Sequence, residues 1–524
     1  MRGLITSILT AIAITSLQAQ SMKVEPKVVV GLNIDQLSTE LIEAYWNLYR
    51  EDGFKKLWKE GLVYKDTDFS LAKRDRSNTT ATLNTGTTPS IHGIIANQWL
   101  DLSTMQPKSC IYDSAYMGNY TSLSSSAQNL LSSTITDELK LASHGKAIVY
   151  SIAPEADMAI LSAGHGADAA LWFNKETGKW CGSTYYSDFP WWASQYNEQN
   201  PIYYRENSLE WVPLLPIENY NQSLNGRKKS FRHSLTSNSN SEQYAKVPIS
   251  PIINEEIVLL AEQLFRQSGV GEDDITDFIQ LSFYGGNALG TSEAASLEIQ
   301  DTYIRLDRSI AQILQIIDNK IGLKNTIFYV TSTGYVNGQT GNVLKEHRIP
   351  TGDFYLNRCS ALLNLYLMAY YGEGQFVEAH HDLQIYLNHK LIEDKKLKIE
   401  DVQQRAANFL SQFSGVNEVY YAQDLLLGSW NPYKELERNS FHKKRSGDLV
   451  IEVLPGWQII NEKDVQSTVN YSAIQTPTIF LGAPFKAEVI NTPISAEAIA
   501  PTIAQTIKIR APNGSRSKAI DRIR

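Results

Sequence analysis

Continuous apolar segments that alternate with amphipathic stretches set the fold of this chain. Residues 28–34, VVVGLNI, form an unbroken apolar run that ends at Asp35. A run of this kind is typical of a parallel β-strand that is buried on both faces. Further strand candidates occupy four segments: residues 146–152, 275–284, 326–331 and 476–481.

Amphipathic helices are predicted between these strands, notably over residues 253–267, 294–317 and 399–413. The alternation favours an α/β fold, a mostly parallel sheet sandwiched by helices. Residues 168–250 are rich in Trp, Tyr, Asn and Ser and have weak periodicity, so we interpret them as an inserted cap. A second insertion of mixed helix and strand is expected over residues 352–455.

The first residues have the pattern of a secretory signal peptide. Arg2 supplies a positive start, and residues 4–17 form an apolar stretch that is too short for a stable membrane span. We therefore expect a Sec signal peptide over residues 1–20, a periplasmic or secreted protein, and no transmembrane span. The sheet domain is then expected in three parts: residues 21–167, 251–351 and 456–524.

Composition narrows the possible partners. The chain has 524 residues, a net charge of −8 and 43% hydrophobic residues, which is ordinary for a globular protein and does not favour nucleic acid. Its three cysteines, Cys110, Cys181 and Cys359, allow at most one disulfide, and nothing near them resembles a zinc-ligand cluster.

Several motifs occur in a fixed order along the chain. TGTTPSIHGI at residues 85–94 precedes NQWLD at 97–101, SAGH at 162–165, DTYIRLD at 301–307 and RSGDL at 445–449. These segments resemble elements of the alkaline phosphatase superfamily, in particular its secreted phosphate-irrepressible bacterial phosphomonoesterases and the type I phosphodiesterase/nucleotide pyrophosphatase-like group. The resemblance covers nearly the whole mature chain and implies an alkaline phosphatase-like fold.

Members of that superfamily hydrolyse phosphate esters with two zinc ions and a Ser or Thr nucleophile, so the resemblance assigns roles by position. Asp35 matches the first Asp ligand and is the one metal position that is kept. Arg76 stands at the nucleophile position, where a permanently protonated guanidinium cannot attack phosphate. Thr79 and Thr80 would offer hydroxyls only if the alignment slips. Arg76 would instead place a fixed positive charge where a metal sat, or be an ordinary surface residue.

At the other ligand positions, where the superfamily has Asp or His, this chain has residues of other types. By the resemblance these positions are occupied by Gly286, Gly290, Ser332, Thr333 and Gln475. A shift of one residue would place Thr333 and Gly334 at the last Asp-His pair. Because zinc needs about four N, O or S ligands, we expect no bound cofactor.

The expected substrate cleft has changed its charge as well. The superfamily places Lys and Arg where this chain has Glu155 and Asp157, and two carboxylates would repel a phosphate dianion. Asn97, the third residue expected in the cleft, is retained. His92 and His165 lie in matching elements, where we expect them to make structural hydrogen bonds.

The sequence thus predicts a pseudoenzyme: a secreted alkaline phosphatase-like protein that has lost two-zinc hydrolysis and acts in binding or envelope assembly, with an envelope protein as its partner. A second hypothesis is an active phosphomonoesterase or phosphodiesterase with an unconventional site. It would use Thr79 or Thr80 as nucleophile and zinc on Asp35. A third is a non-catalytic sensor of phosphorylated or glycan ligands.

Overall fold

The computed structural model describes residues 25–523 apart from residues 187, 201, 203, 205–208, 222–229, 238–241, 290–295, 338–349, 461–465 and 469–470. The expected signal peptide therefore lies outside the described residues. Within the described part of the chain, no helix is both long enough and apolar enough to cross a membrane.

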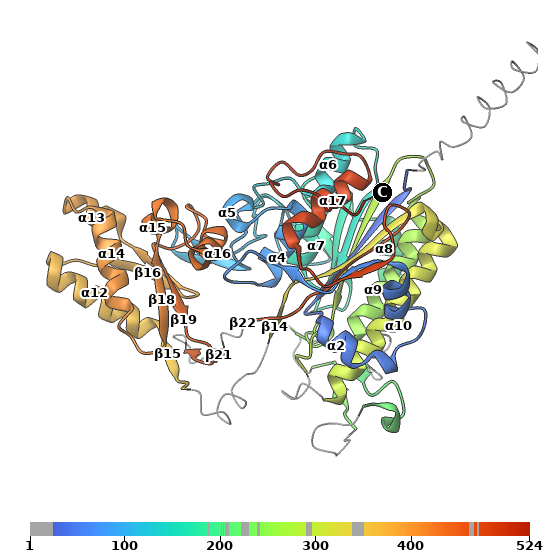
Figure 1. Ribbon diagram of the computed structural model, residues 1–524, viewed down its shortest axis with the longest axis horizontal. Helices are drawn as coiled ribbons and strands as arrows, with labels where there is room; N and C mark the ends of the chain where they lie inside the picture. Colours follow the sequence, from blue (N-terminus) through green and yellow to red (C-terminus); the bar gives the residue numbers. More distant parts are fainter. Residues whose placement is uncertain are drawn as a thin grey trace, which may run out of the picture.

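A ten-stranded sheet forms the centre of the larger lobe (Figure 1). Its strand order is β24-β2-β23-β13-β1-β12-β7-β8-β9-β6. Five central strands pair in parallel: β13 (Thr326–Ser332), β1 (Val28–Asp35), β12 (Asp277–Tyr284), β7 (Val149–Ala153) and β8 (Ala169–Phe173). The outer strands are β24 (Glu488–Ile490), β2 (Leu62–Tyr64), β23 (Thr478–Leu481), β9 (Trp180–Ser183) and β6 (Gly118–Asn119). The predicted mostly parallel α/β fold is confirmed.

Helices cover both faces of this sheet. One face carries α9 (Ile252–Gln267) and α10 (Leu297–Lys320). The other carries α4 (Arg76–Thr85), α6 (Ile135–Ala142), α7 (Ala156–Ala163) and α17 (Ile499–Thr506) (Figure 1).

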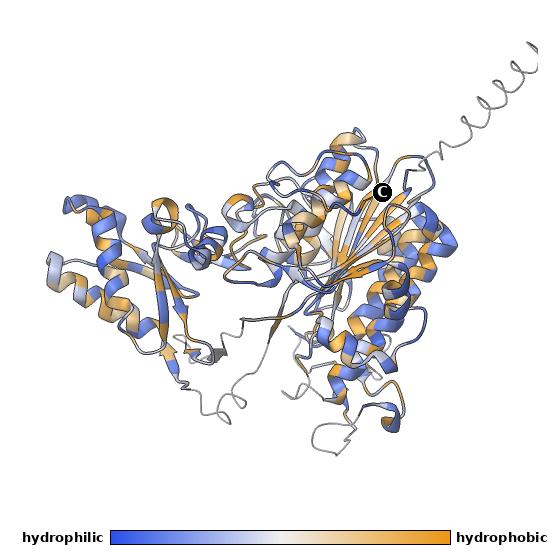
Figure 2. Cartoon of the chain, viewed as in Figure 1, coloured by the Kyte–Doolittle hydropathy of each residue, from blue (hydrophilic) through white to orange (hydrophobic). Residues whose placement is uncertain are grey.

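The apolar character of β1 follows from this double cover. Val28, Val30 and Leu32 pack into the core on the α9–α10 side, whereas Val29 packs into the core on the α4–α7 side. Successive side chains of a strand point to opposite faces, so both sets must be apolar. Figure 2 shows the resulting hydrophobic strands between helices whose outer faces are hydrophilic.

The expected cap begins later than residue 168. Strands β8 and β9 fall within the expected cap, yet both lie in the main sheet. The later part of the region carries α8 (Trp191–Gln199) and a hairpin of β10 (Glu210–Trp211) and β11 (His233–Ser234), which pack on the α9–α10 side. The aromatic residues of this region hid the strand pattern, because Trp172 and Trp180 are core residues of the sheet.

A second, smaller lobe is formed by residues 353–460, which we call the inserted lobe (Figure 1). It has its own hydrophobic core, which runs from Phe354 to Val453. Parallel pairing of β15 with β20 carries it past the expected end at residue 455. Its strands are β15 (Asp353–Tyr355), β16 (Val377–His381), β17 (Gln384–Leu387), β18 (Val416–Tyr421), β19 (Leu449–Val453) and β20 (Gln458–Ile460). Its helices are α12 (Leu356–Tyr371), α13 (His389–Asp394), α14 (Ile399–Leu410), α15 (Ala422–Leu427) and α16 (Pro432–Ser440).

Asp301 on α10 fixes the β10 segment to the sheet domain. Its buried carboxylate accepts hydrogen bonds from Trp211 Nε1 at 2.7 Å, Leu214 N at 2.8 Å and Tyr220 Oη at 2.6 Å. It also forms an ion pair with Arg305 Nε at 2.7 Å. The Asp301 carboxylate therefore accepts from four donors and connects α10 to the segment that contains β10.

Asp301→Ala should lower the free energy of unfolding by about 3 to 5 kcal/mol, because it leaves a buried guanidinium without its main counter-charge. Asp274→Ala, at an exposed carboxylate before β12, should change it by less than about 0.5 kcal/mol. Urea unfolding of both variants measures the difference. Equal effects of the two substitutions would contradict the anchoring role of Asp301.

Candidate functional site

Several of the predicted site residues lie at the carboxyl ends of three adjacent parallel strands. Asp35 ends β1, Tyr284 ends β12 and Ser332 ends β13. Asp35 is only 4% exposed. Gln36, which follows it, has a φ of 64°, a left-handed conformation that turns the chain sharply after the strand.

The hydroxyls of Ser332 and Thr333 hold this turn in place. Thr333 Oγ1 accepts from Gln36 N at 3.0 Å and donates to Asp35 Oδ1 at 2.8 Å. Ser332 Oγ accepts from Leu37 N and donates to Leu37 O, each at 3.1 Å. Both residues stand at expected ligand positions, but their hydroxyls are occupied by the loop that follows β1.

Space at the end of β12 is also filled. A Cβ atom at Gly286 would lie 2.6 Å from Tyr284 Oη and 2.9 Å from Gln36 Oε1. Those distances are too short for a Cβ contact, so an Asp at this position would require both side chains to move. Glycine here fits the closely packed tyrosine and glutamine rather than a metal.

An ion pair occupies the position expected for the nucleophile and the phosphate clamp. Arg76 begins α4, and its Nε lies 2.9 Å from Asp157 Oδ2 while its Nη2 lies 2.9 Å from Asp157 Oδ1. Ser77 Oγ donates to the same carboxylate at 2.7 Å. The Asp157 side chain is 5% exposed and that of Arg76 is 24% exposed. Such a two-pronged contact fixes both side chains.

Burial and charge act in opposite directions on the carboxyl groups. Burial raises the pKa of Asp35, and Arg76 and the hydrogen bond from Thr333 only partly offset it. Burial likewise raises the pKa of Glu155, partly offset by Arg76. For Asp157 burial also acts upward, but Arg76 and Ser77 together hold its pKa below the ordinary value. The positive charge of Arg76 is thus matched chiefly by Asp157.

A small cavity of about 80 Å³ lies among these groups. Its lining residues are Asp35, Gln36, Arg76, Pro154, Glu155, Met158, Pro248, Ile249, Tyr284, Ala288 and Tyr335. Asp35, Arg76 and Glu155 therefore lie around one cavity. Their order in the sequence alone could not establish this proximity.

Other predicted site residues lie outside this cavity. Thr79 and Thr80 are fully buried, and Thr79 Oγ1 donates to Asp75 O at 2.7 Å within its own helix. Asn97 and Gln475 are exposed and do not line the cavity. Gly290 lies outside the described residues.

The donor set at the cavity does not fit a pair of zinc ions. Zinc takes about four N, O or S ligands, whereas the cavity offers the carboxylates of Asp35 and Glu155 beside the cation of Arg76. In the described part of the chain, no group of three or more His, Cys, Asp or Glu residues is placed to hold a metal ion. The absence of a bound cofactor stays a prediction.

The sequence did not point to Tyr284, Tyr335 or Gln36, although all three line the cavity. Tyr335 is buried, and a hydrogen bond with its side chain acts to lower the pKa of Asp35, against the larger effect of burial. The available signal was position: Tyr284 ends β12 and Gln36 directly follows β1, whereas Tyr335 begins β14 (Tyr335–Asn337), shortly after the end of β13.

Comparison with known proteins agrees with this architecture. Residues 29–477 match the family described as type I phosphodiesterase / nucleotide pyrophosphatase. The chain belongs to this family. The match covers most of the chain and confirms the resemblance to the alkaline phosphatase superfamily.

Relatives and solved structures extend the match to nearly full length. The alkaline phosphatase PafA of Elizabethkingia meningoseptica is 29% identical over 522 residues, covering 95% of this chain and 94% of that protein. A protein named calcium-transporting ATPase, from Myroides odoratus, is 31% identical over 519 residues, covering 94% and 93%. The crystal structure of wild-type PafA has a TM-score of 0.82 at 27% identity, covering 95% of this chain and 99% of that one.

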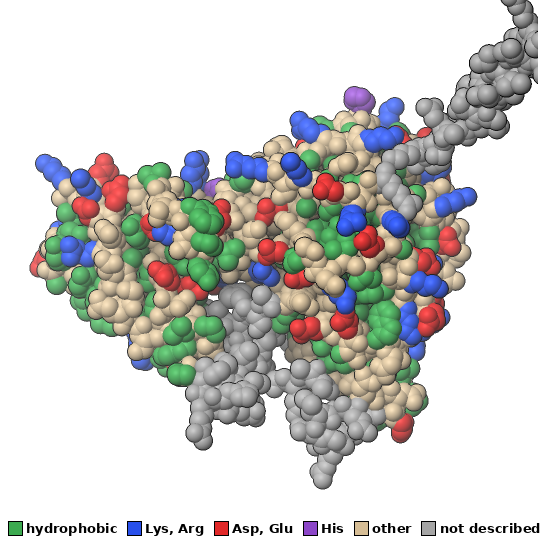
Figure 3. Space-filling view, viewed as in Figure 1, with side chains coloured by type: hydrophobic (Ala, Val, Ile, Leu, Met, Phe, Trp, Pro, Cys, Tyr) green, Lys and Arg blue, Asp and Glu red, His purple; other side chains and the backbone are tan. Residues whose placement is uncertain are grey.

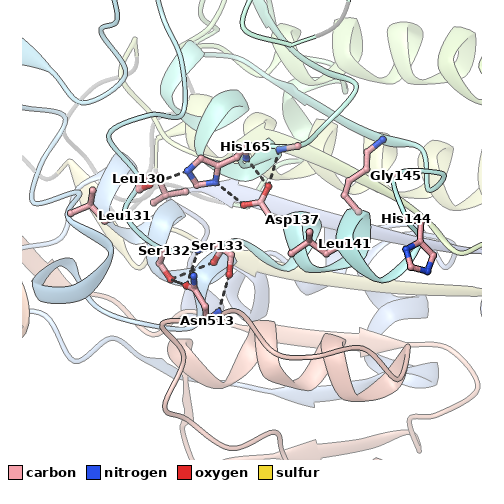
Figure 4. Close-up of a pocket in the computed structure, with 12 residues that line it drawn as sticks. Leu130, Leu131, Ser132, Ser133, Asp137, Leu141, His144, Gly145, His165 and Asn513 are labelled. Atoms are coloured by element: carbon pink, nitrogen blue, oxygen red, sulfur yellow. Dashed lines mark hydrogen bonds and ion pairs between the residues drawn. The ribbon is translucent and has the colours of Figure 1, made fainter.

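A second, open groove of about 820 Å³ lies beside α6 (Figure 4). His165 Nδ1 lies 2.8 Å from Asp137 Oδ2, and its Nε2 lies 3.0 Å from the carbonyl oxygen of Leu130. Both partners are acceptors, so the protonated imidazolium, which can donate from both ring nitrogens, is the form that satisfies both contacts. This structural role agrees with the expectation for His165 in a family element.

Arg76→Ala should lower the free energy of unfolding by about 3 kcal/mol or more, because it leaves the Asp157 carboxylate buried without its partner. The double variant Arg76→Met/Asp157→Leu should cost much less than the sum of its two single changes. Denaturant unfolding of Arg76→Met, Asp157→Leu and the double variant measures this coupling. Arg50→Ala, at an exposed pair with Asp52, serves as control and should cost less than about 0.5 kcal/mol. Additive effects of Arg76 and Asp157 would contradict the ion pair.

The contribution of His165 to stability should depend on pH. Burial acts against its charge, but Asp137 raises the pKa of His165 above 6.5, and the pKa of Asp137 is lowered, mainly by His165 against the effect of burial. A raised histidine pKa stabilises the fold fully below the unfolded pKa, and this contribution is lost as pH rises through the folded pKa. His165→Asn should therefore destabilise more at about pH 6 than at about pH 9.

Unfolding of wild type and variant across that range measures the change. His144→Asn, at an exposed histidine of the same groove with a left-handed φ of 53° that asparagine tolerates, is the matched control. A His165 effect that does not vary with pH would show that the imidazole is neutral in the folded protein.

Proposed function

We propose that this chain is a non-hydrolytic member of its phosphoesterase family that acts by binding in the cell envelope. The observation that carries the proposal is the Arg76–Asp157 ion pair at the place where the nucleophile and the phosphate clamp are expected. A guanidinium can hold an anion but cannot form a phosphoryl intermediate, since it has no nucleophilic form at ordinary pH.

The charge arrangement supports this reading. Arg76 is already matched by Asp157, and Asp35 and Glu155 add carboxyl groups to the same small space. A phosphate dianion that entered would be repelled by these carboxyl groups, because Arg76, the cation that lines the cavity, is already paired with Asp157. Loss of hydrolysis and loss of phosphate binding therefore go together at this edge of the sheet.

The size of the cavity supports the proposal independently. Sites for small molecules usually span about 300 to 1,000 Å³, whereas this cavity measures about 80 Å³. Tyr284, Gln36 and Tyr335 line this small space. Its size supports a search for binding partners on the surface of the molecule rather than in the expected substrate cleft.

A hydrolase with an unconventional site is the second candidate. It is favoured by the retained Asp35 and by relatives that are named alkaline phosphatases. Thr79 and Thr80, its nucleophile candidates, are buried within α4 and would require that helix to move. For this reason we rank it below the binding role.

Export and an envelope protein as partner complete the proposal. The apolar stretch that follows Arg2 supports a Sec signal peptide. A partner in the periplasm or at the cell surface would then be encountered after export, and it should raise the apparent stability of the fold when added.

Elemental analysis of protein purified without chelators, together with hydrolysis of an aryl phosphate, tests the loss of chemistry. We expect near-zero zinc and no turnover above background, because the donor set cannot hold two metal ions. About two zinc ions per chain with turnover would overturn the proposal. Turnover that depends on added metal and disappears in Asp35→Ala would support the second candidate instead.

A further inference from the structure

A pocket of about 540 Å³ lies where the inserted lobe meets the sheet domain. Helix α16 and the β18–β19 pair form most of its wall, and Ala72 of the sheet domain completes it. Asn439 Nδ2 donates to Ser70 O at 3.0 Å, so α16 is held against the sheet domain at this point. The pocket is distinct from the small cavity at the carboxyl edge of the main sheet.

Three glutamates face this pocket from different elements. Glu418 on β18 and Glu452 on β19 are directly opposite each other in the antiparallel pair, and Glu437 comes from α16. Like charges opposite one another destabilise a strand pair. Tyr420 Oη donates to Glu452 at 3.3 Å. Within the described part of the chain, the side-chain carboxylates of Glu418 and Glu437 accept no hydrogen bond and form no ion pair.

The nearby cations already have partners. Lys434 lines the pocket, but its Nζ lies 2.7 Å from Asp424 Oδ2. Lys73, the cation that acts on Glu437, forms an ion pair with Asp382. The three glutamates therefore share a pocket in which the neighbouring positive charges are engaged elsewhere.

The surroundings of Glu437 disfavour the ionised form of its carboxyl group. Burial raises the pKa of Glu437 to about 7, with a further contribution from Glu452 and a small offset from Lys73. The ionised form of a carboxyl group held in this way is stabilised when a cation enters beside it, because the attraction to the cation offsets the cost of desolvation and the repulsion by the other carboxylates. The pocket is thus suited to a positively charged group from outside the described structure.

Residues 427–433, which join α15 to α16 and which we call the loop, carry exposed apolar side chains, and Asn431 and Tyr433 of this segment line the pocket. Leu427 is 76% exposed, Trp430 is 69% exposed and Tyr433, which also lines the pocket, is 77% exposed. Figure 3 shows hydrophobic side chains gathered on the surface of the inserted lobe. Clustered exposed apolar side chains mark interaction surfaces, and Trp and Tyr are favoured where binding energy concentrates. Their ring faces also attract cations.

We propose that this pocket and the loop beside it bind a lysine-bearing apolar segment of a partner polypeptide. The ammonium of lysine is a compact point charge that three carboxylates can surround, whereas the planar fork of arginine suits one carboxylate. The aliphatic stem of the lysine would lie against Tyr420 and Tyr433, and neighbouring apolar residues of the segment would cover Leu427 and Trp430. Charge complementarity selects this occupant over an anionic surface.

The test uses the full chain and a short fluorescent peptide of alternating leucine and lysine. Fluorescence polarisation should show saturable binding that Glu437→Gln/Glu452→Gln weakens by about tenfold or more. Trp430→Ala should weaken it several-fold. Glutamine keeps the shape of glutamate and removes repulsion, so the double variant should unfold no earlier than wild type. Glu393→Gln/Glu400→Gln, at exposed glutamates on α13 and α14 of the same lobe, is the charge-matched control and should leave the affinity within about twofold.

Each alternative occupant has its own result. Equal weakening by Glu393→Gln/Glu400→Gln would mean that the affinity follows the net charge of the protein, and it would overturn the site. If spermidine bound as tightly as the peptide, the ligand would be a free polyamine, and the proposal of a polypeptide segment would be wrong. Binding to vesicles of anionic phospholipid that Trp430→Ala abolishes and the glutamine variants leave unchanged would make the loop a membrane contact and refute the proposal.

Discussion

A guanidinium and a carboxylate meet beside the point where the central parallel strands end. Arg76 begins α4 and Asp157 lies in the first turn of α7, so their ion pair joins two helices that cover the same face of the sheet. A charge taken out of water is tolerated only with a partner, and neither residue can therefore change alone. Asp35 and Glu155 must share the field of the same cation, which explains why burial prevails and raises the pKa of both.

The rest of this edge has adapted to the ion pair in a consistent way. Thr333 and Ser332 use their hydroxyls to satisfy the backbone of the turn after β1. Gly286 leaves room for Tyr284, whose ring closes the cavity from the β12 side. In these contacts the hydroxyls of Ser332 and Thr333 are paired with groups of the protein. The hydrophobic cores on both faces of the sheet are formed by its strands and helices.

Much of the sheet could be predicted from sequence, because β1, β12 and β13 are long apolar runs whose burial leaves a clear pattern. The same reasoning failed at β8 and β9, where Trp, Asn and Gly in and around two short strands obscure it. At the site, Asp35 and Arg76 could be named from motif spacing, but their closeness depends on parallel strand order. The closure by Tyr284 and Tyr335 could not be foreseen, since a tyrosine at a strand end has no distinctive chemistry in sequence. The three glutamates of the inserted lobe come from separate elements, and only the fold places them together.

The inserted lobe can specialise without disturbing the sheet domain because it has a hydrophobic core of its own. Its attachment relies on polar contacts, among them Asn439 to Ser70 and Lys73 to Asp382. The acidic pocket lies at this attachment, with Ala72 on one side and Glu437 on the other. A group that binds there contacts both lobes, so binding and lobe attachment are coupled by position. The acidic pocket and the exposed apolar side chains beside it belong to the inserted lobe, whereas the small cavity with Arg76 lies at the edge of the main sheet.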